Sequence, residues 1–164
     1  MSQLLQQVRK LVPTVREVIQ LGQILNLARE SFEIGERREP STLNMQRWEA
    51  YHKDPQIQKA KRDFFDYLNS MPYDDVVLIG SIMYIGRDEK DPDDYERRKQ
   101  EFEEEGYYFD ESEDGVYDSP QKKIFDYMKH IKRSKTPKDV VIGMMMEKAP
   151  LPNYLTRGLH ILGF

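Results

Sequence analysis

Oxygen-bearing side chains in the stretch DESEDGVYDSPQ follow the spacing of an EF-hand calcium loop. Such a loop places oxygen ligands at its first, third, fifth and ninth positions and a glycine at its sixth. The sixth position here is Gly115, and the four ligand positions hold Asp110, Ser112, Asp114 and Asp118. A calcium-binding helix-loop-helix over 110–121 is therefore one candidate function, with these four side chains carrying the metal.

Several features around the same stretch argue against calcium. The twelfth position of an EF-hand is a glutamate that supplies two oxygens, but here the neutral Gln121 stands at that position. Gly106 also ends the preceding charged segment four residues early, and the sequence holds no second loop of this pattern. The competing interpretation is an acidic loop, 106–119, that connects two helices and turns at Asp114-Gly115.

The segment KKIFDYMKHIKRSKTPK, residues 122–138, interleaves basic and aromatic side chains. Bound to nucleic acid, its cations would neutralise phosphates, and binding would weaken steeply with salt. The contacts would be Lys129, Lys132, Arg133 and Lys135. However, the whole chain has a net charge of −4, and an amphipathic helix that buries one stripe produces the same alternation. We keep nucleic-acid binding through the basic helix 122–138 as an alternative and expect nucleic acid not to be a partner.

Other residue patterns with catalytic or metal-binding meaning are missing from the sequence. The histidines, His52, His130 and His160, have neither the i, i+4 nor the HExxH spacing of a zinc site. There is no cysteine, which excludes disulfides, thiolate metal sites and a cysteine nucleophile. No GxGxxG, GxxxxGK or GxSxG motif occurs. We expect no cofactor, and the sequence favours a non-catalytic protein over an enzyme.

Charge is distributed unevenly along the chain. Residues 87–118 contain fifteen acids and five bases, which gives a net charge of −10, whereas residues 121–148 contain eight bases and three acids, which gives +5. An acidic segment thus precedes a basic one. We expect the two to neutralise each other, either within one chain or between two copies of it.

Length and composition fit one soluble helical domain over residues 1–164. The 164 residues are enough for a substantial core. The first residues, MSQLLQQVRK, lack the apolar core of a signal peptide, and no run is apolar and long enough to span a membrane. We therefore expect a cytoplasmic protein without a membrane partner.

Proline positions predict where the helices begin. Asp54-Pro55, Asp91-Pro92, Ser119-Pro120 and Thr136-Pro137 each pair a side-chain acceptor with a following proline, which is typical of a helix start. Together with hydrophobic periodicity they predict an all-α bundle of seven to eight helices. Residues 73–85 are apolar nearly all round, so this helix belongs in the centre, and Gly86 is expected to end it. β-branched runs at 76–79 and 140–142 leave strands there as an alternative.

The N-terminal segment, 1–40, is amphipathic and precedes the remainder of the bundle, 41–164. Its apolar stripe begins with Leu4, Val8, Leu11 and Val15. We expect Pro13 to split or kink this helix because proline removes a backbone donor. A domain of this size need not bury the whole stripe, so these four residues are the predicted interface with a partner.

Two segments resemble a bacterial family catalogued as domain of unknown function 3775. The first is MPYDDVVLIGSIMYIGRDEKDPDDYERR, 71–98, with its aromatic-Ile-Gly-Arg sequence before an acidic turn. The second is PLPNYLTRGLHILG, 150–163. Together they cover about a quarter of the chain. The resemblance implies a small helical fold, assigns no activity, and gives no support to the stretch 110–118 as a site.

From these observations the sequence predicts a small bacterial helical protein that works through protein–protein contacts. The prediction includes self-association as a homodimer, and it leaves the identity of any other protein partner open. It rests on the missing catalytic motifs, the separation of charge, and a family resemblance without known chemistry.

Overall fold

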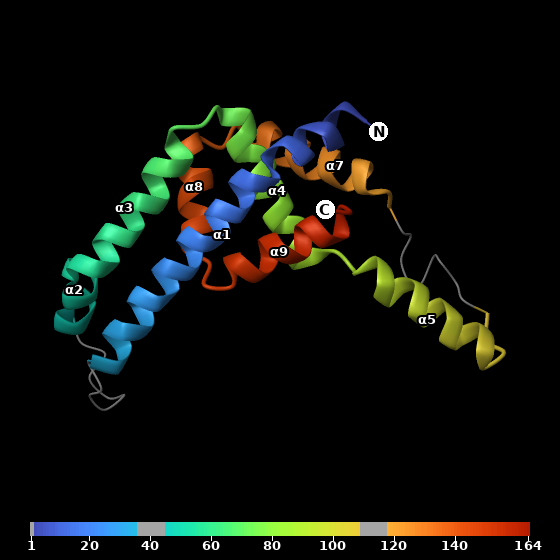
Figure 1. Ribbon diagram of the computed structural model, residues 1–164, viewed down its shortest axis with the longest axis horizontal. Helices are drawn as coiled ribbons and strands as arrows, with labels where there is room; N and C mark the ends of the chain where they lie inside the picture. Colours follow the sequence, from blue (N-terminus) through green and yellow to red (C-terminus); the bar gives the residue numbers. More distant parts are fainter. Residues whose placement is uncertain (1, 36–44, 109–117) are drawn as a thin grey trace.

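A computed structural model describes residues 2–35, 45–108 and 118–164, and the prediction of an all-α fold is confirmed (Figure 1). Within these ranges every regular element is a helix, including the two β-branched runs. None of these helices combines the length and apolar character needed to cross a membrane. The eight helices are α1 Gln3–Gly35, α2 Met45–Lys53, α3 Pro55–Asn69, α4 Tyr73–Asp88, α5 Pro92–Glu104, α7 Pro120–Arg133, α8 Lys138–Met146 and α9 Leu151–Ile161.

Three of the four predicted helix starts have the expected side-chain cap. The Asp54 carboxylate accepts the N–H of Ile57 at 2.9 Å to begin α3. Asp91 begins α5 and Ser119 begins α7 in the same way. The fourth prediction is wrong in register because Pro137 itself stands at the N-cap of α8, without a side-chain cap.

Helix α4 is the centre of the bundle. Its side chains from Val76 to Met83 have essentially no exposed surface, and it packs against α9, α7, α8 and α1. Helices α1 and α3 form a second layer that extends to the left in Figure 1, with α2 beside the beginning of α3. The prediction that residues 73–85 lie in the centre is therefore confirmed.

Two glycines let α4 and α9 approach to backbone contact. A Cβ built on Gly86 would lie 1.7 Å from the carbonyl oxygen of Tyr154, and one on Gly158 would lie 2.1 Å from that of Ile82. No side chain fits at either position. The expectation that Gly86 ends the helix is wrong, since α4 continues to Asp88 and Gly86 serves the crossing instead.

Arg157 ties the end of α4 to α9. Its guanidinium donates to the Gly86 carbonyl oxygen at 2.8 Å and to the Glu89 carbonyl oxygen at 2.7 Å. Carbonyls in the last turn of a helix lack intrahelical partners, and a charged donor is well suited to them. The two segments that carry the family resemblance thus meet at one crossing, with a glycine from each.

Helix α1 passes through Pro13 without a break, so the predicted split does not occur. Pro13 lies on the exposed side of the helix, where solvent can serve the carbonyl that loses its partner. The opposite side of α1 enters the core through Val8, Val15 and Val18.

Helix α5 differs from the other helices because it extends away from the bundle (Figure 1). It stays attached at its beginning, where Tyr95 is buried. It ends at Glu104, and Gly106, just after the C-cap residue, has a φ of +78° in the left-handed region that favours glycine. We call residues 92–108 the acidic arm.

Candidate functional site

Most of the predicted calcium loop lies outside the described residues. This applies to Asp110, Ser112 and Asp114. Asp118 is described, and its carboxylate accepts a hydrogen bond from the Lys122 ammonium at 2.6 Å. Asp118 therefore pairs with a base in the first turn of α7, and the calcium prediction stays untested.

The four predicted nucleic-acid contacts do not form one uniform basic surface. Lys132 makes an ion pair with Asp74 at 2.8 Å, and the Lys129 ammonium lies 5.8 Å from the centre of the Phe125 ring. Lys135 follows the end of α7 with a left-handed φ of +50°. Only Lys129, Lys132 and Arg133 share a groove.

This open groove has a volume of about 690 Å³ and runs between the N-terminal turns of α1, the start of α4 and α7. Its apolar surface comes from Leu4, Leu78, Phe125 and Met128. The three cations just named line it as well, together with the acids Asp74 and Asp75. We call it the α7 groove.

The four residues of the predicted N-terminal interface divide into two classes. Val8 and Val15 are fully buried in the chain's own core, which leaves them no surface for a partner. Leu4 and Leu11 pack against that core and stay partly exposed. Of the four, Leu4 lines the α7 groove.

Among the described residues, the acidic segment pairs with the basic one at Asp118, which contacts Lys122, and near the base of the arm. There the buried Lys123 ammonium pairs with Glu89 at 3.0 Å. Along α5 itself, Arg97 pairs with Asp94 and Glu101 inside the helix. The helix holds six acids and three bases, and it points away from α7 in Figure 1.

The arm ends in exposed aromatic rings. Tyr107 and Tyr108 keep 65% and 88% of their surface exposed. The Tyr107 ring lies edge-on against Phe102, with ring centres 6.4 Å apart. Phe125, on the α7 groove, is 54% exposed. Aromatic side chains exposed to this extent are characteristic of interaction surfaces.

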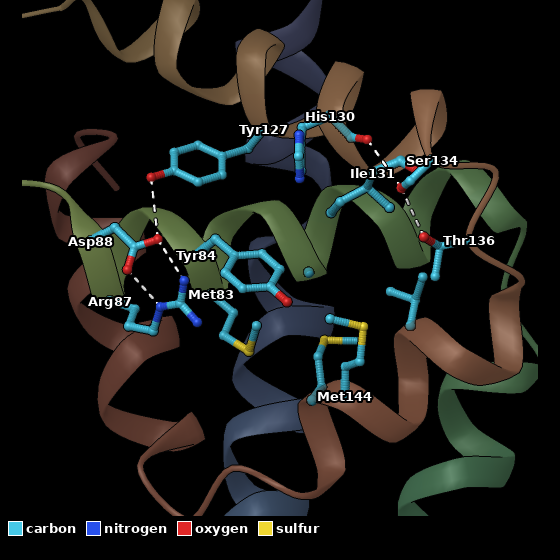
Figure 2. A pocket seen from close by; sticks show the side chains of 13 residues that line it. Met83, Tyr84, Arg87, Asp88, Tyr127, His130, Ile131, Ser134, Thr136 and Met144 are labelled. Atoms are coloured by element: carbon cyan, nitrogen blue, oxygen red, sulfur yellow. Dashed lines mark hydrogen bonds and ion pairs between the residues drawn. The ribbon is translucent and has the colours of Figure 1, made fainter.

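A second hollow, a cavity of about 360 Å³, lies between α4, α7 and α8 (Figure 2). Its floor is apolar and includes the fully buried Met83 and Met145, with Gly80 between the helices. No sequence motif marks it, because its lining comes from three separate helices. Two of its lining residues, Met144 and Met145, belong to the run of three methionines at 144–146.

One wall of this cavity is aromatic. The rings of Tyr84 and Tyr127 are parallel within 3°, with centres 6.2 Å apart. The Arg87 guanidinium lies 4.7 Å from the centre of the Tyr84 ring and forms two hydrogen bonds with the Asp88 carboxylate. Figure 2 shows Arg87 and Asp88 at one end of the cavity, with His130 over it.

The Tyr127 hydroxyl is held in its protonated form. It donates to Glu89 at 3.3 Å and reaches Asp88 at 3.5 Å. Burial, and then these two carboxylates, raises the pKa of Tyr127 above the usual tyrosine value. The group is therefore a hydrogen-bond donor that supports the wall rather than a proton acceptor.

Three possible metal ligands meet where α5 begins beside α9. His160 Nε2 lies 3.5 Å from a carboxylate oxygen of both Asp91 and Asp93, and one ligand atom from each of the three residues lies within 4.8 Å of the other two. Asp91 already caps α5 by accepting the N–H of Asp93. Asp93 and His160 are exposed, so the cluster is a surface contact between the arm and α9.

No protein-family model, curated protein or solved structure matches this chain. The resemblance to domain of unknown function 3775 thus stays a prediction from its two motifs.

Proposed function

We propose that this protein is a non-catalytic interaction module that binds a second copy of itself through the acidic arm and the α7 groove. The observation that carries the proposal is the arm's position. It leaves the bundle with excess negative charge and ends in exposed tyrosines. Helix α7 holds five bases and one acid. Three of these bases pair with acids of the same chain, and Lys129 and Arg133 are exposed on the groove. One copy directs the arm away from its own α7.

Charge and exposed apolar surface both support this pairing. Glu103 and Glu104 are exposed near the tip of the arm, and Lys129 and Arg133 are exposed on the groove. Attraction between such surfaces directs encounter and register. Contact between the arm's tyrosines and the exposed Phe125 would add apolar burial, which is the main favourable term in association.

A second copy of the chain offers a partner both for the acidic arm and for the α7 groove. In a two-fold symmetric dimer each arm reaches the groove of the other chain, so the same contact forms twice and the assembly closes. The resemblance to the bacterial family fits this role, since it implies a helical protein without assigned chemistry.

Sedimentation velocity across a concentration series tests the proposal. We expect a species of twice the 19.5 kDa chain mass, with a dissociation constant that rises with salt because exposed charges are screened. Lys129→Glu with Arg133→Glu should weaken the dimer roughly tenfold or more.

The matched control reverses two charges on α3, away from the groove, with Lys59→Glu and Arg62→Glu. This variant should dimerise like the unmodified chain. A monomer at every concentration, or equal weakening by both double variants, would contradict the proposal.

A further inference from the structure

Gly80 lies at the cavity, where an added side chain would approach neighbouring side chains rather than backbone. A Cβ at this position would meet only side-chain atoms, at 3.3 Å from Val141 Cγ1 and 3.8 Å from Ile131 Cδ1. By contrast, a Cβ on Gly86 would collide with backbone. Glycine is among the least favourable residues inside a helix, so its place in the fully buried face of α4 needs another reason. Two features of the structure are relevant: the close approach of Val141 and the space that the glycine leaves in the cavity.

The interior of this space is suited to an apolar, flat body. Met83 and Met145 are fully buried at its floor, and methionine side chains adapt to aromatic surfaces. Tyr84 and Tyr127 add two parallel ring faces to the wall. The volume of about 360 Å³ lies within the range of small-molecule sites.

The rim combines one ion pair with side chains that can form hydrogen bonds. Arg87 is paired with Asp88, so neither is available as a lone countercharge. The other polar groups at the cavity are neutral hydroxyls and one imidazole. Ser134 Oγ and Thr136 Oγ1 lie 2.9 Å apart, and the His130 ring has no hydrogen-bond partner among the described residues.

We propose that the cavity between α4, α7 and α8 is a binding site for a small, uncharged aromatic molecule with a hydrogen-bonding edge. Its ring lies on the methionine floor against Tyr84, and its polar edge faces His130. A charged ligand is disfavoured because burying an ion without a free counterion is costly. The site is separate from the α7 groove and does not depend on self-association.

Methionine methyl NMR with three probes tests this site. With ¹³C-methyl methionine, indole should give saturable shifts at Met83 and Met145. Met45, exposed on α2, serves as the internal control and should not move. Benzoate and benzylamine, which carry opposite charges, should bind at least tenfold more weakly than indole.

Two variants and one matched control complete the test. Gly80→Leu fills the cavity and should abolish the indole shifts, whereas Gly143→Leu makes the same change at a glycine with open space around it and should retain them. His130→Ala, at an exposed position, should weaken indole about three- to tenfold. The affinity of His130→Ala for indole can be measured even if Gly80→Leu does not fold. Absent shifts, tighter binding of a charged probe, or unchanged affinity in His130→Ala would overturn the proposal.

Discussion

The α4–α9 crossing and the acidic arm represent two opposite uses of a helix in one chain. At the crossing, Gly86 and Gly158 remove side chains so that backbones touch, and the surrounding residues are buried. In the arm, charged residues dominate and α5 leaves the bundle. The difference indicates that the crossing stabilises the fold, whereas α5 buries little beyond Tyr95, which fits the binding role that we propose for the arm.

The largest loss of stability is expected from adding a single methyl group at the crossing. Gly86→Ala places a Cβ on the Tyr154 carbonyl, and because the obstacle is backbone, the helices must separate. We expect a loss of about 3 kcal/mol or more of unfolding free energy, at the upper end of overpacking costs. Urea denaturation measures it.

Gly143→Ala is the matched control for that experiment. A Cβ at Gly143 meets no atom within 4 Å, so alanine there should be neutral or stabilising by up to about 1 kcal/mol. Equal urea midpoints for the two variants would contradict the claim that Gly86 is needed for the close contact between α4 and α9.

Loss of the Arg157 contacts should have the next largest effect. Arg157→Met keeps most of the aliphatic length but leaves the Gly86 and Glu89 carbonyl oxygens without this donor. We expect a loss of about 1–3 kcal/mol, the range for hydrogen bonds with a charged partner. Arg157→Lys should recover part of it in a thermal melt. A melt unchanged by Arg157→Met would show that solvent serves these carbonyls equally well.

Stability at alkaline pH should report the raised pKa of Tyr127, which lies in the wall of the cavity. The pKa of Tyr127 is raised in the folded state, so above about pH 10 the unfolded chain loses this proton first. Stability should therefore fall as pH rises, and Tyr127→Phe should show a shallower fall. Identical slopes of unfolding free energy against pH for both proteins would contradict the raised pKa.

The smallest effect on stability should come from the arm. Glu103→Ala with Glu104→Ala changes two exposed residues, and such substitutions usually alter stability by no more than about 0.5 kcal/mol. Calorimetry should show a nearly unchanged melting temperature, while sedimentation shows weaker self-association. A large drop in melting temperature would mean that the arm is part of the fold.

Local chemistry made much of the fold predictable. Caps such as Asp54 and Asp91 act within three residues, so the sequence itself contains the signal. The role of Gly86 was missed because a glycine near a helix end has the same local pattern whether it ends the helix or contacts a neighbour. Only the position of α9 distinguishes the two.

The candidate sites were harder to predict because they depend on packing. The apolar stripe of α1 was correctly identified, yet whether Val8 and Val15 face a partner or the core depends on where α3, α4 and α9 lie. Similarly, nothing in the sequence near Lys132 indicates a partner for its charge, whereas in the fold its ammonium lies 2.8 Å from the Asp74 carboxylate. The cavity combines three segments, none of which has a motif.

The most direct test of arm-to-groove pairing mixes two complementary charge variants in native mass spectrometry. One carries Lys129→Glu and Arg133→Glu on the groove, and the other carries Glu103→Lys and Glu104→Lys on the arm. Each alone sets like charges against each other and should stay monomeric. Together they restore opposite charges at both contacts, so we expect a mixed dimer identified by its mass. If the mixture stays monomeric, or if either variant dimerises alone as well as the unmodified chain, the arm does not bind the groove.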